Sequence, residues 1–76
     1  MKVLIKVFYF YNDHECLQKG VFPVKYKDYK IDPDQAAADS AAVFVRVIQK
    51  MFPEMKIKKV LYSDGIDITE LVEKRV

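Results

Sequence analysis

The side chains that could do nucleophilic or metal chemistry gather in one stretch, Asp13-His14-Glu15-Cys16, which holds the only histidine and the only cysteine of the chain. A Cys–His nucleophile pair needs the imidazole within about 2.6–3.2 Å of the sulfur and a third group that orients it. A structural zinc site needs four ligands, commonly in two spaced pairs. This short spacing in a polar connector fixes neither arrangement. We therefore expect no catalytic residue, no metal and no cofactor, and interpret the stretch as a solvated loop.

The lysines suggest a different chemistry, because tyrosines are interleaved with them. If they converge on an open sheet face, the rings between them would form a stacking platform for single-stranded nucleic acid. The residues of this alternative are Lys6, Lys25, Lys27, Lys58, Lys59, Tyr26 and Tyr62. The competing interpretation is that the lysines keep edge strands and an exposed face soluble. The net charge is only +2 and arginine is limited to Arg46 and Arg75, so we rank nucleic acid second.

Residues 33–52 are predicted to form the one long helix that positions the other elements. Asp32 is a suitable N-cap, Pro33 occupies the first helical position, and Gln35 can close a capping box. An alanine-rich run follows, and Pro53 ends the helix. The β-branched residues 43–48 could instead form a strand, but the cap, the alanines and the proline agree on a helix. The expected apolar side consists of Ala37, Ala41, Phe44, Val45, Ile48, Met51 and Phe52, flanked by Ala36, Val43 and Val47, and the expected polar side of Asp39, Arg46, Gln49 and Lys50.

Three strands are expected around this helix. Residues 2–11 alternate with Val3, Ile5, Val7, Tyr9 and Tyr11 on one face. Residues 12–20 are expected to be a polar connector and residues 21–31 a second strand, which Pro23 confines to a sheet edge or to a start near residue 24. Residues 56–63 form the third strand, with Ile57 and Leu61 on one face and Val60 and Tyr62 on the other.

The C-terminal region is expected to contain a short strand and a short helix. Asp64-Gly65 is a turn signal, and Asp67 with Glu70 resembles a helix cap. The predicted fold class is therefore α+β, with residues 1–76 forming a single domain. Its architecture is a two-layer ββαβ sandwich, in which one long helix covers one face of an antiparallel or mixed sheet.

The second face of residues 2–11 is the strongest functional signal. One helix covers one sheet face, so the other face keeps an apolar row. This row consists either of Leu4, Phe8 and Phe10 or of Val3, Ile5, Val7 and Tyr9. Such a row marks a surface for a partner or for self-association, unless Ile66, Ile68, Leu71 and Val72 fold back over it. The residues expected to bind a partner are Leu4, Phe8, Phe10, Tyr9 and Tyr11.

These observations predict a small non-enzymatic protein-binding module, an inhibitor or accessory protein that covers a partner's surface and forms a homodimer through its sheet. A single cysteine forms no internal disulfide and no long apolar run is present, so we expect a cytoplasmic protein without a membrane segment. In size and element order the chain is similar to small phage-encoded inhibitors, anti-CRISPR proteins among them. This similarity of outline, which includes no residue-level motif, implies a viral or prophage origin.

Overall fold

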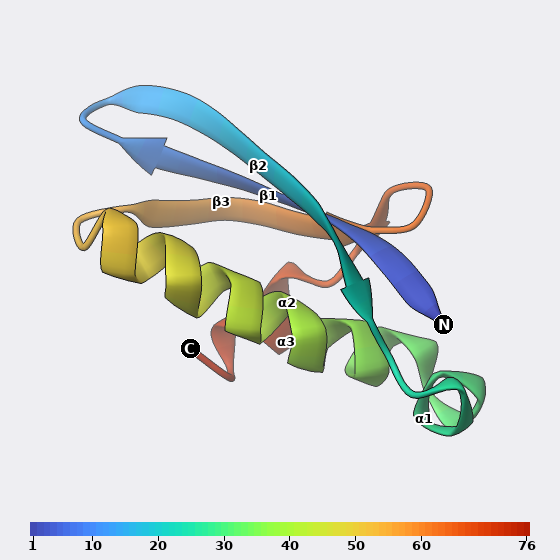
Figure 1. Ribbon diagram of the computed structural model, residues 1–76. Coiled ribbons are helices and arrows are strands. Elements are labelled where there is room, and N and C mark those ends of the chain that lie inside the picture. The colour runs from blue at the N-terminus through green and yellow to red at the C-terminus, as the bar shows by residue number, and fades with distance from the viewer.

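The alternating apolar residues near the N-terminus form β1 (Lys2–Tyr11), the central strand of the sheet. The computed structural model describes residues 1–76 and shows a four-stranded sheet in the order β2-β1-β3-β4, with every neighbouring pair antiparallel (Figure 1). The other strands are β2 (His14–Pro23), β3 (Lys56–Tyr62) and β4 (Ile66–Asp67). The long helix packs on one sheet face, so the predicted α+β class and two-layer arrangement are confirmed, and the sheet is antiparallel.

The predicted polar connector at residues 12–20 is wrong, because most of it belongs to β2. Asn12 and Asp13 both have positive φ values, 52° and 63°, and form the two-residue turn of a tight hairpin. The sequence does not show the apolar–polar alternation typical of a strand here, because Gln18 and Gly20 occupy the helix-facing side of β2 in place of large apolar residues. These two residues pair with Val7 and Ile5 of β1.

The predicted second strand at residues 21–31 is also wrong over most of its length. β2 ends at Pro23, and a short helix, α1 (Tyr26–Ile31), follows. Tyr26 and Tyr29 are three residues apart, a spacing that fits one face of a helix. Tyr29 packs edge-on against Tyr62, with ring centroids 6.5 Å apart.

The long helix α2 (Pro33–Met51) begins as expected. Asp32 is the N-cap and its Oδ1 accepts from the Gln35 backbone N–H at 3.2 Å. The Gln35 side chain does not close a capping box, because its Oε1 accepts from Arg75 instead. The buried side is rotated from the expected one, and Val43, Val47 and Met51 are exposed. The buried residues of α2 are Ala36, Ala37, Ala38, Ala41, Ala42, Val45 and Ile48.

The rotation has its cause in the C-terminal helix α3 (Thr69–Glu73), which packs beside α2. Asp39 and Arg46, expected on the solvent side of α2, both contact Arg75. The sequence does not show that this side of α2 has a neighbour.

A β-bulge in β3 changes which of its side chains face α2. Phe8 pairs with Lys59 but Tyr9 pairs with Ile57, so the register shifts by one residue between them. Ile57 therefore packs with Val60 against the core, whereas Leu61 faces the other side. The predicted placement of Ile57 and Leu61 on one face is wrong for this reason.

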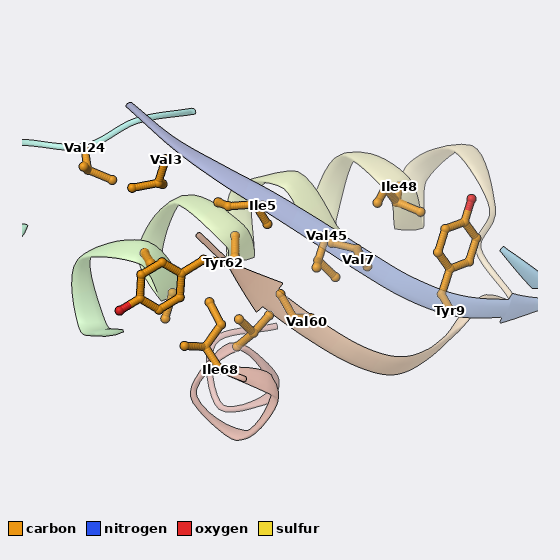
Figure 2. Close-up of a cluster of buried hydrophobic side chains, with 14 of the residues drawn as sticks. Val3, Ile5, Val7, Tyr9, Val24, Val45, Ile48, Val60, Tyr62 and Ile68 are labelled. Carbon is orange, nitrogen blue, oxygen red and sulfur yellow. The ribbon is translucent and has the colours of Figure 1, made fainter. Parts of the chain in front are cut away.

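The hydrophobic core lies between β1, α2 and the C-terminal segment (Figure 2). Val3, Ile5, Val7 and Tyr9 of β1 are buried there, and no charged side chain is buried. The other side chains that Figure 2 labels are Val24, Val45, Ile48, Val60, Tyr62 and Ile68. No helix of the molecule combines the length and the apolar character that a membrane crossing requires.

Tyr62 is the one core residue with a hydroxyl bonded to a carboxylate. It is 1 % exposed, and its hydroxyl donates to Asp34 Oδ1 at 2.5 Å. Burial raises the pKa of the Tyr62 phenol, and the hydrogen bond to Asp34 raises it further. The folded protein therefore keeps this phenol protonated at pH values at which the unfolded chain would ionise it.

Tyr62→Phe should lower the free energy of unfolding by about 1 kcal/mol at neutral pH, because the hydrogen bond to Asp34 is lost. The raised pKa stabilises the fold fully below the ordinary tyrosine value of 10.0, and this contribution falls as pH rises above that value. The stability advantage of the wild type over Tyr62→Phe should therefore shrink above that pH in urea titrations. An advantage that stays constant across the alkaline range would contradict the assignment.

Candidate binding surface on the uncovered side of the sheet

One face of the sheet has no helix over it. The even-numbered side chains of β1 point to this face, because the odd-numbered ones point into the core. Their cross-strand partners in β2 and β3 lie on the same face. We call this surface the open face; it consists of Leu4, Lys6, Phe8, Phe10, Glu15, Leu17, Lys19, Val21, Lys56, Lys58, Lys59 and Leu61.

The open face exposes large apolar side chains on neighbouring strands. Phe10 is 40 % exposed, and Leu17 and Val21 in β2 are 50 % and 60 % exposed. Phe8 pairs with Leu17 and lies next to Phe10 on this side of β1, so these three side chains form a contiguous apolar strip. The pair of Leu4 with Val21 is separated from this strip by the pair of Lys6 with Lys19. Contiguous apolar surface of this kind is typical of an interaction site.

Lysines border this strip and two of them lie over its aromatic rings. Lys59 Nζ is 4.8 Å from the centroid of the Phe8 ring, and Lys58 Nζ is 5.8 Å from that of Phe10. These distances suit cation–π contacts. Lys58 also forms an ion pair with Glu15 at 2.5 Å. Asp67 of β4 pairs with Leu61, so a second carboxylate lies on this side of the sheet, beyond β3. The surface is therefore apolar along its strands and positively charged around them.

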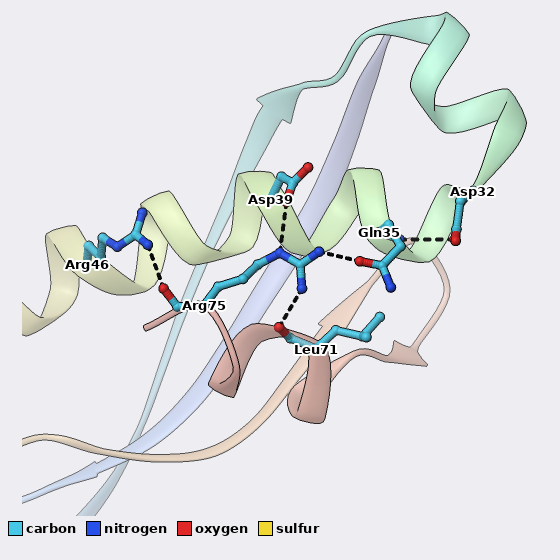
Figure 3. Close-up of polar contacts among 6 residues, drawn as sticks. All are labelled: Asp32, Gln35, Asp39, Arg46, Leu71 and Arg75. Atoms are coloured by element: carbon cyan, nitrogen blue, oxygen red, sulfur yellow. Dashed lines mark hydrogen bonds and ion pairs between the residues drawn. The ribbon is translucent and has the colours of Figure 1, made fainter.

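The C-terminal segment does not cover the open face, because it is held against α2 on the other side of the sheet (Figure 3). The Arg75 guanidinium donates to Asp39 at 2.8 Å, to the Leu71 carbonyl at 2.7 Å and to Gln35. Arg46 of α2 in turn donates to the Arg75 carbonyl at 2.5 Å. The expected alternative, in which the C-terminal residues fold back over the apolar row, is wrong.

The C-terminal side chains named in that alternative lie elsewhere. Ile68 and Val72 are buried in the core, and Leu71 packs against it. Ile66 is exposed in β4 at the far end of the sheet from β2.

The residues expected to bind a partner divide between the two faces of β1. Leu4, Phe8 and Phe10 come together on the open face. Tyr9 is only 3 % exposed and Tyr11 is half-buried, and both pack against Phe52 on the helix-covered side. The predicted membership of the two tyrosines in this surface is wrong, because their odd positions in β1 direct their side chains to the other face of the sheet.

The residues of the nucleic-acid alternative do not form one surface. Lys6, Lys58 and Lys59 lie on the open face, whereas Tyr62 is part of the core. The other members, Lys25, Tyr26 and Lys27, lie at the start of α1, beyond the end of β2.

Sequence reasoning missed six members of the open face, namely Glu15, Leu17, Lys19, Val21, Lys56 and Leu61. The signal that could have found those in β2 is the alternation of Glu15, Leu17, Lys19 and Val21. It becomes visible once Asn12-Asp13 is recognised as a hairpin turn.

His14 and Cys16 lie in β2 and not in a loop. Cys16 is half-buried, and its Sγ lies 3.7 Å from the His14 carbonyl oxygen, with no hydrogen bond to the imidazole. No three His, Cys, Asp or Glu side chains lie close enough together to hold a metal ion. The structure therefore places no third side chain where it could orient the His14 imidazole or complete a metal site with His14 and Cys16.

A shallow depression at the free edge of β3 also carries polar side chains, but they are bonded to one another. Asp67 Oδ1 accepts from the Thr69 N–H at 2.9 Å and from its hydroxyl at 2.6 Å. These hydrogen bonds from Thr69 lower the pKa of Asp67. Thr69 Oγ1 also accepts from the Val60 N–H at 2.9 Å. This network joins the start of α3 to β3.

Comparison of the chain with protein-family models, with curated proteins and with solved structures finds no match. The interpretation of the open face therefore rests on its own geometry.

Phe10→Ser should cost little stability, because the Phe10 ring lies on the uncovered side of the sheet. We expect a loss of less than about 1 kcal/mol. Ile5→Val, on the core side of the same strand, should cost about 0.5–1.5 kcal/mol although it removes only one methylene. Urea denaturation of both variants measures the difference. A loss of about 3–5 kcal/mol for Phe10→Ser, as for a buried phenylalanine, would contradict an open face.

Proposed function

We propose that this protein is a non-enzymatic protein-binding module whose open face binds an acidic partner surface that also carries apolar side chains. The observation that supports the proposal is the uncovered strip of Phe8, Phe10 and Leu17 with lysines around it. A protein of this kind acts as an inhibitor or accessory protein by covering a surface of its partner.

The apolar strip supplies the driving force for binding. Burial of apolar surface contributes roughly 25 cal/mol for each Å² removed from water. Aromatic side chains are enriched at interface centres, where they add much area at low entropic cost. Phe8 and Phe10 occupy this central position, because they lie on β1 with a strand on either side.

The lysines determine which partner is favoured. A complementary surface would place Asp or Glu side chains opposite Lys6, Lys19 and Lys59, and like charges would be rejected. A second copy stacked face to face would bring these lysines against one another. The open face is therefore unsuited to face-to-face self-association and is suited to an acidic partner.

A random-peptide display library, selected on the wild-type protein and counter-selected on the Phe8→Ser/Phe10→Ser double variant, tests this function. We expect the surviving peptides to be acidic and to contain aromatic or aliphatic residues. Their binding should weaken with salt, because the lysines contribute to it. Lys59→Glu should weaken binding further.

The matched control is Lys27→Glu, which makes the same charge change on α1, away from the open face. It should leave peptide binding unchanged. Peptides that bind the wild type and the double phenylalanine variant equally well would contradict the proposal, as would a selection dominated by basic peptides.

Single-stranded nucleic acid is the second candidate, favoured by one specific observation. Phe8 and Phe10 are two residues apart on one face, and each has a lysine over its ring, at 4.8 Å and 5.8 Å. Bases can stack on such rings while lysines contact the phosphates. The aliphatic Leu4, Leu17, Val21 and Leu61 favour protein over bases.

Fluorescence anisotropy with a labelled oligothymidylate distinguishes the two candidates. Salt-sensitive binding that Phe8→Ser/Phe10→Ser abolishes, with no acidic peptide selected, would favour nucleic acid.

A further inference from the structure

The backbone hydrogen bonds show which residues of β2 bond to β1 and which face the free edge of the sheet. Met1 and Val24 exchange two hydrogen bonds, from the Met1 amino group to the Val24 carbonyl at 3.1 Å and from the Val24 N–H to the Met1 carbonyl at 2.8 Å. Bonded and non-bonded pairs alternate along an antiparallel ladder. In the observed register this makes Tyr11 and His14 a bonded pair, as the two-residue turn between them requires.

The odd-numbered residues of β2 consequently direct their backbone groups away from β1. Glu15, Leu17, Lys19 and Val21 present both N–H and C=O to the free edge of the sheet. β2 is the last strand in the sheet order, so no strand of the sheet covers this edge. Only at its end is the edge closed, where the Pro23 carbonyl accepts from the Ser40 hydroxyl at 3.1 Å.

A free edge of this length is a template for another strand. We propose that a second copy of this chain pairs with β2 in antiparallel orientation, with the twofold axis at Leu17. The two sheets then join into one continuous sheet. The proposal concerns the strand edge and goes beyond the partner proposed for the open face.

The charges along β2 select this register. With the axis at Leu17, Glu15 of each copy lies opposite Lys19 of the other, which gives two symmetric opposite-charge pairs. With the axis at Gln18, Leu17 lies opposite Lys19 and Glu15 opposite Val21. With the axis at Lys19, the two lysines oppose each other. Directly opposed unlike charges stabilise an antiparallel pair, and like charges destabilise it.

The hydrogen bonding also fits the axis at Leu17. The outward-directed residues of one copy lie opposite outward-directed residues of the other, so Leu17 forms a bonded pair with itself. The side chains of Glu15, Leu17 and Lys19 lie on the open face. The dimer therefore joins two open faces at Leu17 into one larger surface and leaves Phe8 and Phe10 accessible on each copy.

A charge-reversal cycle measured by sedimentation equilibrium over a dilution series tests this register. Glu15→Lys and Lys19→Glu should each raise the dimer dissociation constant roughly tenfold, because each replaces two attractive pairs by two repulsive ones. The double variant Glu15→Lys/Lys19→Glu should return to within about threefold of the wild type, because both pairs are restored with exchanged signs. The intramolecular pair between Lys58 and Glu15 is not restored, so recovery reports on the contact between copies.

Three control variants separate this dimer from other assemblies. Lys27→Glu, on α1, should leave dimerisation unchanged. Phe8→Ser/Phe10→Ser should also leave it unchanged, although it removes the partner binding proposed for the open face. In a Cys16→Ser background, Leu17→Cys should form a disulfide-linked dimer under mild oxidation. Lys19→Cys should not, because in this register residue 19 lies opposite residue 15.

The proposal would be overturned if the wild type is a monomer at every concentration. It would also be overturned if Glu15→Lys and Lys19→Glu leave the dimer dissociation constant unchanged. A double variant whose dimer dissociation constant is as high as that of the single variants would also overturn the proposal. Loss of the dimer in Phe8→Ser/Phe10→Ser would show face-to-face association instead. Since these measurements need no partner, their failure is distinguishable from failure of the function proposed for the open face.

Discussion

The packing of α2 against the odd-numbered side chains of β1 is the interaction on which the other features depend. It buries Val3, Ile5, Val7 and Tyr9 and directs the even-numbered side chains of the same strand to the opposite side. The C-terminal helix α3 is held beside α2 by Arg75 and cannot reach that side. A chain of 76 residues thus has one helical layer, and its central strand keeps one apolar face uncovered.

The sequence predicted those elements whose signals are local. Asp32, Pro33 and the alanine run define the start of α2, and the unbroken alternation of residues 2–11 defines β1. β2 and α1 were missed for a physical reason. An edge strand with Gln18 and Gly20 on its inner side has little apolar periodicity, and a six-residue helix with no buried residue has no apolar stripe. The bulge in β3 depends on tertiary pairing, which no local pattern reports.

The binding surface was predictable only in its central row. Leu4, Phe8 and Phe10 follow from the alternation of one strand, and the same alternation excludes Tyr9 and Tyr11. The contributions of β2 required the hairpin register, because Leu17 and Val21 belong to the open face only when they lie opposite Phe8 and Leu4. The interleaving of lysines and tyrosines predicts Tyr62 on an open face, whereas tertiary packing places it in the core with its hydroxyl bonded to Asp34.

The central claim is that the side chains of Phe8, Phe10, Leu17 and Val21 form a surface that the protein itself leaves open. Proton relaxation enhancement by a soluble paramagnetic probe measures this directly for assigned side-chain signals. The structure predicts strong broadening for these residues and protection for Val7 and Val45, which are fully buried. Equal protection of both sets would show that another part of the chain covers this face, and would contradict the account.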